Sequence, residues 1–151
     1  MMKAISLWQP WATLLASGVK RYETRSWPTS HRGIIAIHAG KKWDDEILRE
    51  CLSGPLAAAL CAADVEPASL PRGAFVGVAE VVACVPTGGA VQPCGLEEAV
   101  GDWTPGRFVW DCNNAVLFAE PIPARGFQGI WNVTPEQEAQ IAAALATPRR
   151  G

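Results

Sequence analysis

The spacing of apolar and polar residues changes from strand-like to helix-like several times within the first forty residues. A short apolar-leaning run at residues 3–7 predicts a strand. Apolar residues then recur on one helical face between Pro10, typical of a first helical position, and Gly18, typical of a helix end. Residues 21–26 suit a strand, and residues 33–39, GIIAIHA, predict a clearer one because they are rich in β-branched side chains.

The middle of the chain predicts two helices followed by a long strand. Asp44 or Asp45 is placed to cap a helix that runs to Leu52, and proline opens a second, alanine-rich helix at residues 55–62. Residues 74–85 give the longest strand signal of the chain.

The last third begins with a segment rich in glycine and proline. Residues 86–106 predict a long loop or lid that contains a short helix near residues 96–100. Two strands are expected next, at residues 107–112 and 115–120. A capping box that begins at Thr134 then predicts a terminal helix.

Strands interleaved with short helices, without regular βαβ spacing, predict a mixed α/β (α+β) fold, a small barrel with peripheral helices. The chain has 151 residues, a length that fits one domain, and shows neither an internal repeat nor a linker. We therefore expect a single domain over residues 1–151.

Composition and charge narrow the class of function. The chain is 49% hydrophobic and 19% charged, which is typical of a folded globular protein. Its net charge of -2 argues against a protein that coats long nucleic acids by bulk electrostatics. Any contact with a polyanion is therefore expected to be local.

The cysteines and the N-terminus bear on compartment and cofactors. Five cysteines without CxxC spacing or paired histidines indicate neither a disulfide framework nor a zinc site. We expect a reduced cytoplasmic location and no metal or other cofactor. No long apolar leader and no uninterrupted apolar stretch of 18 residues are present, so neither secretion nor membrane insertion is expected.

The segment GVKRYETRSW, residues 18–27, concentrates charge directly after the first predicted helix. Side chains alternate along a strand, so Glu23 and Arg25 share one face. Lys20 joins them only from the bend that follows Gly18. The segment is either a solvated charged strand or the wall of a cleft that binds a polar ligand.

Aromatic residues and an amide flank this charged segment. Trp8, Trp11 and Trp27 are candidates for stacking against a planar ring, although most tryptophans belong to a core. Gln9 lies between Trp8 and Pro10 and is suited to hydrogen bonding with the edge of a base, or it is an ordinary turn residue.

Glu80 is isolated within the apolar strand 74–85. An ionised carboxylate among valines and alanine is costly unless its face opens to a cleft or a cation. Glu80 is therefore either a site residue or the end of a solvent-facing row. His31 and His38 have no adjacent nucleophile motif, and we expect structural or rim positions for both.

Three segments of the sequence carry a family resemblance: ISLWQPWATLLASGVKRYETRSW, RGIIAIHA and, at residues 120–133, EPIPARGFQGIWNV. They resemble the ASCH domain family within the PUA-like superfamily. The resemblance includes the pattern GxKxxExR, here with Lys20, Glu23 and Arg25. It implies a small β-barrel whose ends are covered by helices, with a cleft near this pattern.

The resemblance also implies a choice of functions. PUA-like domains often bind RNA, some ASCH proteins are ribonucleases, and others are amidohydrolases that remove the N4-acyl group from acylated cytidines. Lys20 matches the lysine of the compact amidohydrolases, whereas Glu23 stands where they have threonine. The compact amidohydrolases also use a glutamate from further along the chain, and no motif identifies its equivalent here. Glu80 is the first candidate for that residue, with Glu97 and Glu98 as alternatives.

The resulting expectation is a metal-independent amidohydrolase whose partner is a small nucleoside or nucleobase. Trp8 or Trp27 would stack on the ring, and Gln9 would bind its edge. Lys20 and Arg25 would stabilise the oxyanion, and Glu23 or Glu80 would transfer the proton.

The alternative is an RNA-binding module without catalysis, or a ribonuclease. Its cleft would hold an unpaired nucleotide of single-stranded RNA, with phosphates contacted by Arg25, Arg32, Lys41 and Lys42.

Overall fold

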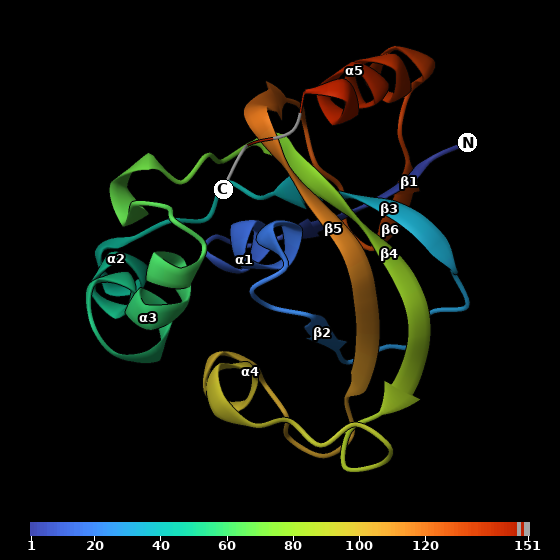
Figure 1. Ribbon diagram of the computed structural model, residues 1–151. Helices are drawn as coiled ribbons and strands as arrows, with labels where there is room; N and C mark the ends of the chain where they lie inside the picture. The colour runs from blue at the N-terminus through green and yellow to red at the C-terminus, as the bar shows by residue number, and fades with distance from the viewer. Residues whose placement is uncertain (148, 150–151) are drawn as a thin grey trace.

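A computed structural model describes residues 1–147 and 149 of the chain (Figure 1). Its strands are β1 (Lys3–Leu7), β2 (Tyr22–Arg25), β3 (Gly33–Ala39), β4 (Ala74–Pro86), β5 (Phe108–Pro123) and β6 (Ile130–Asn132). Its α-helices are α1 (Trp11–Ser17), α2 (Asp45–Leu52), α3 (Gly54–Ala62), α4 (Gly95–Val100) and α5 (Pro135–Ala146). A 3-10 turn, Pro67–Ser69, precedes β4.

The strands form one curled sheet in the order β2-β5-β4-β3-β1-β6. The pairing of β1 with β3 is parallel and the other pairings are antiparallel. Three register shifts between β4 and β5 bend these two long strands, because each bulge adds local twist. The result is a half-barrel of mixed α/β class, which confirms the predicted fold class.

Helix α1 lies inside the curve of the sheet (Figure 1). Gly77 on β4 permits this approach: a Cβ atom there would meet the carbonyl of Val116 and the methyl group of Ala16. Gly18 ends the helix in the left-handed region, at φ 82°, as its sequence position predicts.

Two further apolar clusters join the remaining helices to this framework. Leu14 of α1 packs into a cluster with α2, α3 and Val100 of α4. On the other side, Ile141 of α5 packs with Phe75 and Phe118 of the sheet. Helix α5 begins with the predicted capping box, in which the Thr134 side chain accepts from Gln137 N and the Gln137 side chain accepts from Thr134 N.

Three expectations about the elements are corrected. The strands predicted at 107–112 and 115–120 are one strand, β5, because Asn114 adopts a positive φ of 51° within it and the pairing continues past it. The short strand β6 was not expected. Pro10 is the N-cap of α1 rather than its first helical residue. No helix in the described part of the chain is both long and apolar enough to cross a bilayer.

Candidate functional site

A cleft of about 540 Å³ opens between the end of β1, strand β2 and the loop that follows α4. Its walls are formed by Ser6, Leu7, Trp8, Trp11, Lys20, Glu23, Thr24, Arg25, Gly101, Asp102 and Arg107. The segment GVKRYETRSW therefore forms a cleft wall, and three of its charged side chains line the cleft.

Lys20 reaches the cleft from the bend after Gly18, as the alternation argument requires. Its backbone N–H donates to Leu14 O at 3.0 Å, which fixes the turn at the end of α1. Its side chain is only 3% exposed, and its Nζ donates to Tyr22 O. A buried ammonium needs a counter-charge, and Glu97 Oε1 lies 3.9 Å away.

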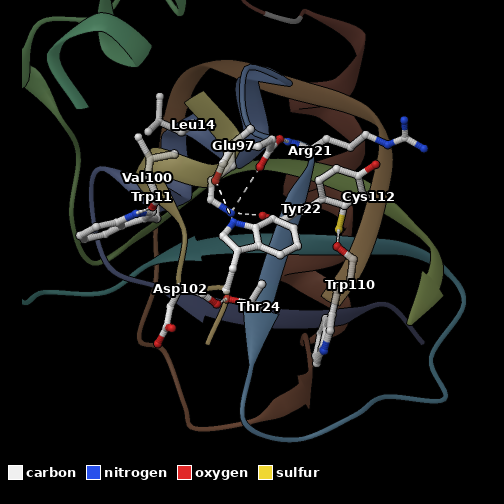
Figure 2. A network of polar contacts seen from close by, with 12 residues as sticks. Trp11, Leu14, Arg21, Tyr22, Thr24, Glu97, Val100, Asp102, Trp110 and Cys112 are labelled. Atoms are coloured by element: carbon white, nitrogen blue, oxygen red, sulfur yellow. Dashed lines mark hydrogen bonds and ion pairs between the residues drawn. The ribbon is translucent and has the colours of Figure 1, made fainter. Parts of the chain in front are cut away.

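Glu97 comes from α4, far from Lys20 in the sequence. Its Oε2 accepts a hydrogen bond from the backbone N–H of Arg21, beside which it lies in Figure 2. Its Oε1 is buried and has no hydrogen-bond partner within residues 1–147 and 149. Glu97 is not part of the cleft lining, so it acts on the cleft through Lys20.

Glu23 and Arg25 share one face of β2, as predicted. Arg25 Nε donates to Glu23 Oε2 at 3.0 Å, and Arg25 Nη2 donates to Ser6 O at 2.6 Å. The guanidinium thereby holds the Glu23 carboxylate against the cleft and ties β2 to β1. Both side chains remain partly exposed to the cleft, at 14% for Glu23 and 23% for Arg25.

The loop after α4 is fixed to the cleft by side chain to backbone hydrogen bonds. Trp11 Nε1 donates to Val100 O at 2.8 Å, and Thr24 Oγ1 donates to Asp102 O at 2.7 Å, as Figure 2 shows. Arg107 Nη2 donates to Thr24 O at 2.9 Å. These bonds attach the loop to α1 and β2, beside the cleft that it helps to line.

The far wall of the cleft carries a second ion pair. Arg107 Nε lies 3.4 Å from Asp102 Oδ2. Hydrogen bonds from the hydroxyl and backbone N–H of Thr104 are the main reason that the pKa of Asp102 is lowered, and Arg107 contributes. Asp102 is therefore an ionised carboxylate at neutral pH.

Cys112 of β5 lies beneath this site, close to Trp110 in Figure 2. Burial is the main cause that raises its pKa to about 12, and the negative charge of Glu23 adds to the rise. The thiol is protonated at neutral pH and is not an activated nucleophile.

The two predicted stacking residues have different surroundings. Trp8 lines the cleft, is 54% exposed, and has Lys42 Nζ at 4.7 Å from its ring centroid. Trp27 is outside the lining and packs edge-to-face against Trp110, with centroids 5.0 Å apart. Trp11, the third aromatic candidate, also lines the cleft.

Gln9 and Glu80 also lie outside the cleft lining. Gln9 is fully buried, and its Nε2 donates to Thr13 Oγ1 and Pro71 O while its Oε1 accepts from Thr13 N. Its amide is thus occupied within the protein. Glu80 on β4 accepts from Asn114 Nδ2 at 3.1 Å. Of the three glutamates weighed for the distant position, the structure brings Glu97 to Lys20.

Sequence reasoning missed Ser6, Thr24, Asp102 and Arg107 as cleft residues. Thr24 alternates with Glu23 and Arg25 along β2, so the period of two gave no reason to include it. Asp102 and Arg107 belong to the predicted lid, but nothing in the local pattern of that loop indicates which strand it closes on.

No group of three or more metal-ligating side chains (His, Cys, Asp or Glu) is suitably placed in the described part of the chain. The chemistry available in the cleft is that of an ammonium (Lys20), two carboxylates (Glu23 and Asp102) and two guanidinium groups (Arg25 and Arg107). The ammonium is suited to stabilising negative charge, and a carboxylate to accepting a proton.

A family model, the ASCH domain, matches residues 5–121. The chain belongs to the ASCH domain family. Activating signal cointegrator 1 of Mus musculus is 32% identical over 133 residues, and its Homo sapiens counterpart is 32% identical over 134. Each alignment covers 85% of this chain, which spans 22% of the length of either relative.

Solved ASCH structures confirm the fold. The crystal structure of ASCH from Zymomonas mobilis superimposes with a TM-score of 0.61 at 16% sequence identity, covering 94% of both chains. A point variant of the same protein superimposes with a TM-score of 0.56 at 15% identity, covering 94% of this chain and 96% of that chain. The half-barrel described above is thus the fold of this ASCH domain.

Proposed function

We propose that this ASCH domain is a metal-independent amidohydrolase that removes the N4-acyl group from acylated cytidine or a cytosine-like base. The observation that supports this best is the buried Lys20 ammonium. Lys20 and Glu23 both line the cleft, and the ammonium is held by Tyr22 O and by Glu97. An ammonium in a partly dehydrated cleft stabilises a developing oxyanion far better than one in water.

The reaction needs one base and one charge stabiliser. Glu23 takes a proton from a water molecule, whose oxygen attacks the acyl carbonyl carbon. Lys20 stabilises the oxyanion that forms there. The carbon to N4 bond then breaks, and Glu23 returns the proton to the leaving N4 amine, which gives cytidine and a carboxylic acid.

The remaining cleft residues bind and orient the substrate. Trp8 is the exposed aromatic surface on which the pyrimidine ring stacks. Arg25 positions Glu23 through the 3.0 Å hydrogen bond, and its remaining N–H groups are available to the acyl oxygen. Glu97 positions Lys20 through their 3.9 Å ion pair.

The first test offers N4-acetylcytidine to the protein and separates the products by chromatography. The wild type is expected to release cytidine and acetate. Glu23→Gln, which preserves shape but removes the base, is expected to lower kcat by about 100-fold or more, within the range for general base catalysis. Glu80→Gln is the matched control and is expected to leave kcat unchanged. Equal rates for the wild type and Glu23→Gln would remove Glu23 from the mechanism.

A second candidate function is a nucleic-acid-binding module without catalysis. Its support is that two exposed aromatic side chains each have a cation over the ring, Lys42 over Trp8 and Arg125 over Phe127. Labelled single-stranded RNA offered in the same assay distinguishes the two. A salt-sensitive mobility shift without cytidine release favours binding alone, and shortened RNA indicates a ribonuclease.

A further inference from the structure

A second cavity of about 570 Å³ adjoins the cleft, and Ser6 lines both. Its lining also includes His38, Lys41, Arg125 and Phe127. The parallel strands β1 and β3 place it here: because they end at the same edge of the sheet, the segments that follow them, with Trp8 and Lys41, lie side by side. The segment after β5 closes the other side.

The electrostatic character of this cavity is cationic. Its lining contains Lys41 and Arg125 and no aspartate or glutamate. Neither cation has a carboxylate within salt-bridge distance in the part of the chain that the structure describes. Arg125 rests over the ring of Phe127, 5.3 Å from its centroid. Both charges are therefore available to an anion that enters from solvent.

Ser6, which lines both cavities, begins a part-buried hydrogen-bonded chain in the wall of the second cavity. Ser6 and His38 are register partners on β1 and β3, and Ser6 Oγ lies 2.9 Å from His38 Nδ1. His38 Nε2 lies 2.8 Å from Ala124 O. A carbonyl only accepts, so Nε2 carries the proton and Nδ1 accepts from the Ser6 hydroxyl. The Ser6 oxygen keeps its lone pairs, so it is still able to accept a hydrogen bond from a ligand.

Gly126 shows how closely the backbone approaches this wall. A Cβ atom at Gly126 would lie 2.5 Å from His38 Cε1 and 2.6 Å from Ser6 Oγ. Only glycine fits there, and the segment that contains Arg125 is consequently held against the Ser6 and His38 pair.

We propose that this second cavity binds the phosphate attached to the nucleoside whose base occupies the cleft, so that the substrate is a nucleotide. The inference rests on the proposed function for the occupant of the cleft. The base stacks on Trp8, a ribose hydroxyl donates to Ser6 Oγ, and the phosphate binds between Lys41 and Arg125. Charged hydrogen bonds of this kind are the strong ones in phosphate recognition.

The test measures binding, by calorimetry on the full chain, of cytidine, cytidine 5′-monophosphate, cytidine 3′-monophosphate and the trinucleotide CCC. At least one phosphorylated ligand is expected to bind about tenfold or more tightly than cytidine, the gain typical of a charged hydrogen bond. Preference for a monophosphate assigns a free nucleotide, and preference for CCC assigns a phosphate within RNA. Equal affinity for all four ligands would overturn the inference.

Variants locate the phosphate. Lys41→Gln and Arg125→Gln are expected to abolish the gain from the phosphate while leaving the affinity for cytidine unchanged. Arg49→Gln, on the exposed surface of α2, is the matched control and keeps the gain. A gain that survives both cavity variants places the phosphate elsewhere and contradicts the proposal. Binding does not require turnover, so a protein that binds nucleotides in this way without hydrolysing N4-acetylcytidine refutes the proposed reaction and not the phosphate site.

Discussion

At the scale of single residues, the proposed hydrolysis depends on the environment of Lys20. Its ammonium is almost fully buried, and a buried charge is tolerated only with partners that compensate for lost hydration. Here these partners are Tyr22 O and the Glu97 carboxylate. The two partners hold the ammonium in position, and in the proposed reaction it stabilises the oxyanion.

In the proposed mechanism Glu97 is a positioning residue, and its variant has a matched control in the same helix. Glu97→Gln removes the counter-charge of Lys20, and we expect kcat for N4-acetylcytidine to fall about tenfold, the effect of roughly 1.4 kcal/mol in the barrier. We also expect KM to stay close to the wild-type value, because Glu97 does not line the cleft. Glu98→Gln, one residue away and exposed, should leave kcat and KM unchanged. Equal kcat values for the two variants would separate Glu97 from the proposed function of Lys20.

His38 makes stability depend on pH. Burial lowers its pKa below the ordinary 6.5, whereas the unfolded chain keeps the ordinary value. Below pH 6.5 the unfolded state therefore binds a proton that the folded state does not, and stability falls as the pH decreases. Urea titrations should show a free energy of unfolding that decreases from pH 7 to pH 5, with a smaller decrease in His38→Gln. An equal decrease in both proteins would argue against a neutral His38 in the folded state.

At the scale of elements, the cap of α5 contributes to stability without touching the cleft. Thr134 accepts a hydrogen bond from Gln137 N, and Thr134→Ala should reduce the free energy of unfolding by about 1 kcal/mol. Ser53→Ala is a suitable control, because Ser53 is the N-cap of α3 but makes no capping hydrogen bond. Urea denaturation checks both, and hydrolysis should be unaffected. A loss of stability at Ser53 as large as at Thr134 would contradict the capping argument.

Most elements were predictable because their signals are local. Gly33–Ala39 combines β-branched residues with flanking glycines, and Asp44 caps α2 through Ile47 N, as the sequence indicates. The join of two predicted strands into β5 was not predictable, because it depends on a bulge opposite β4 that accommodates Asn114. The pairing of β6 with β1 likewise depends on contacts distant in sequence.

The residues of the candidate site also divide into those that a local sequence pattern predicted and those that it did not. Lys20, Glu23 and Arg25 lie within one bend and one strand, and alternation was enough to group them. Glu97 is joined to them only through the folding of the 86–106 segment over the cleft, which the hydrogen bonds of Trp11 and Thr24 maintain. Gln9 was expected to bind a ligand because its amide both donates and accepts hydrogen bonds. In the folded protein that buried amide instead donates to Thr13 Oγ1 and Pro71 O.

At the scale of the whole molecule, the cleft exists because one half-barrel brings together parts of the chain that are far apart in sequence. β1 supplies Ser6, the bend after α1 supplies Lys20, and the lid supplies Asp102 and Arg107. In the two cointegrator relatives the matched region is 22% of the protein's length.

The most direct test of the proposed role of Lys20 compares two proteins, the wild type and Lys20→Met, in the hydrolysis of N4-acetylcytidine. The variant keeps the apolar stem of the side chain but lacks its charge. Circular dichroism on both proteins first establishes that the variant is folded. We predict cytidine release by the wild type and a kcat lower by about 100- to 1000-fold in the variant, the loss typical of removing one oxyanion donor. A folded Lys20→Met protein that releases cytidine at the wild-type rate, or a wild type that releases none, would contradict the account.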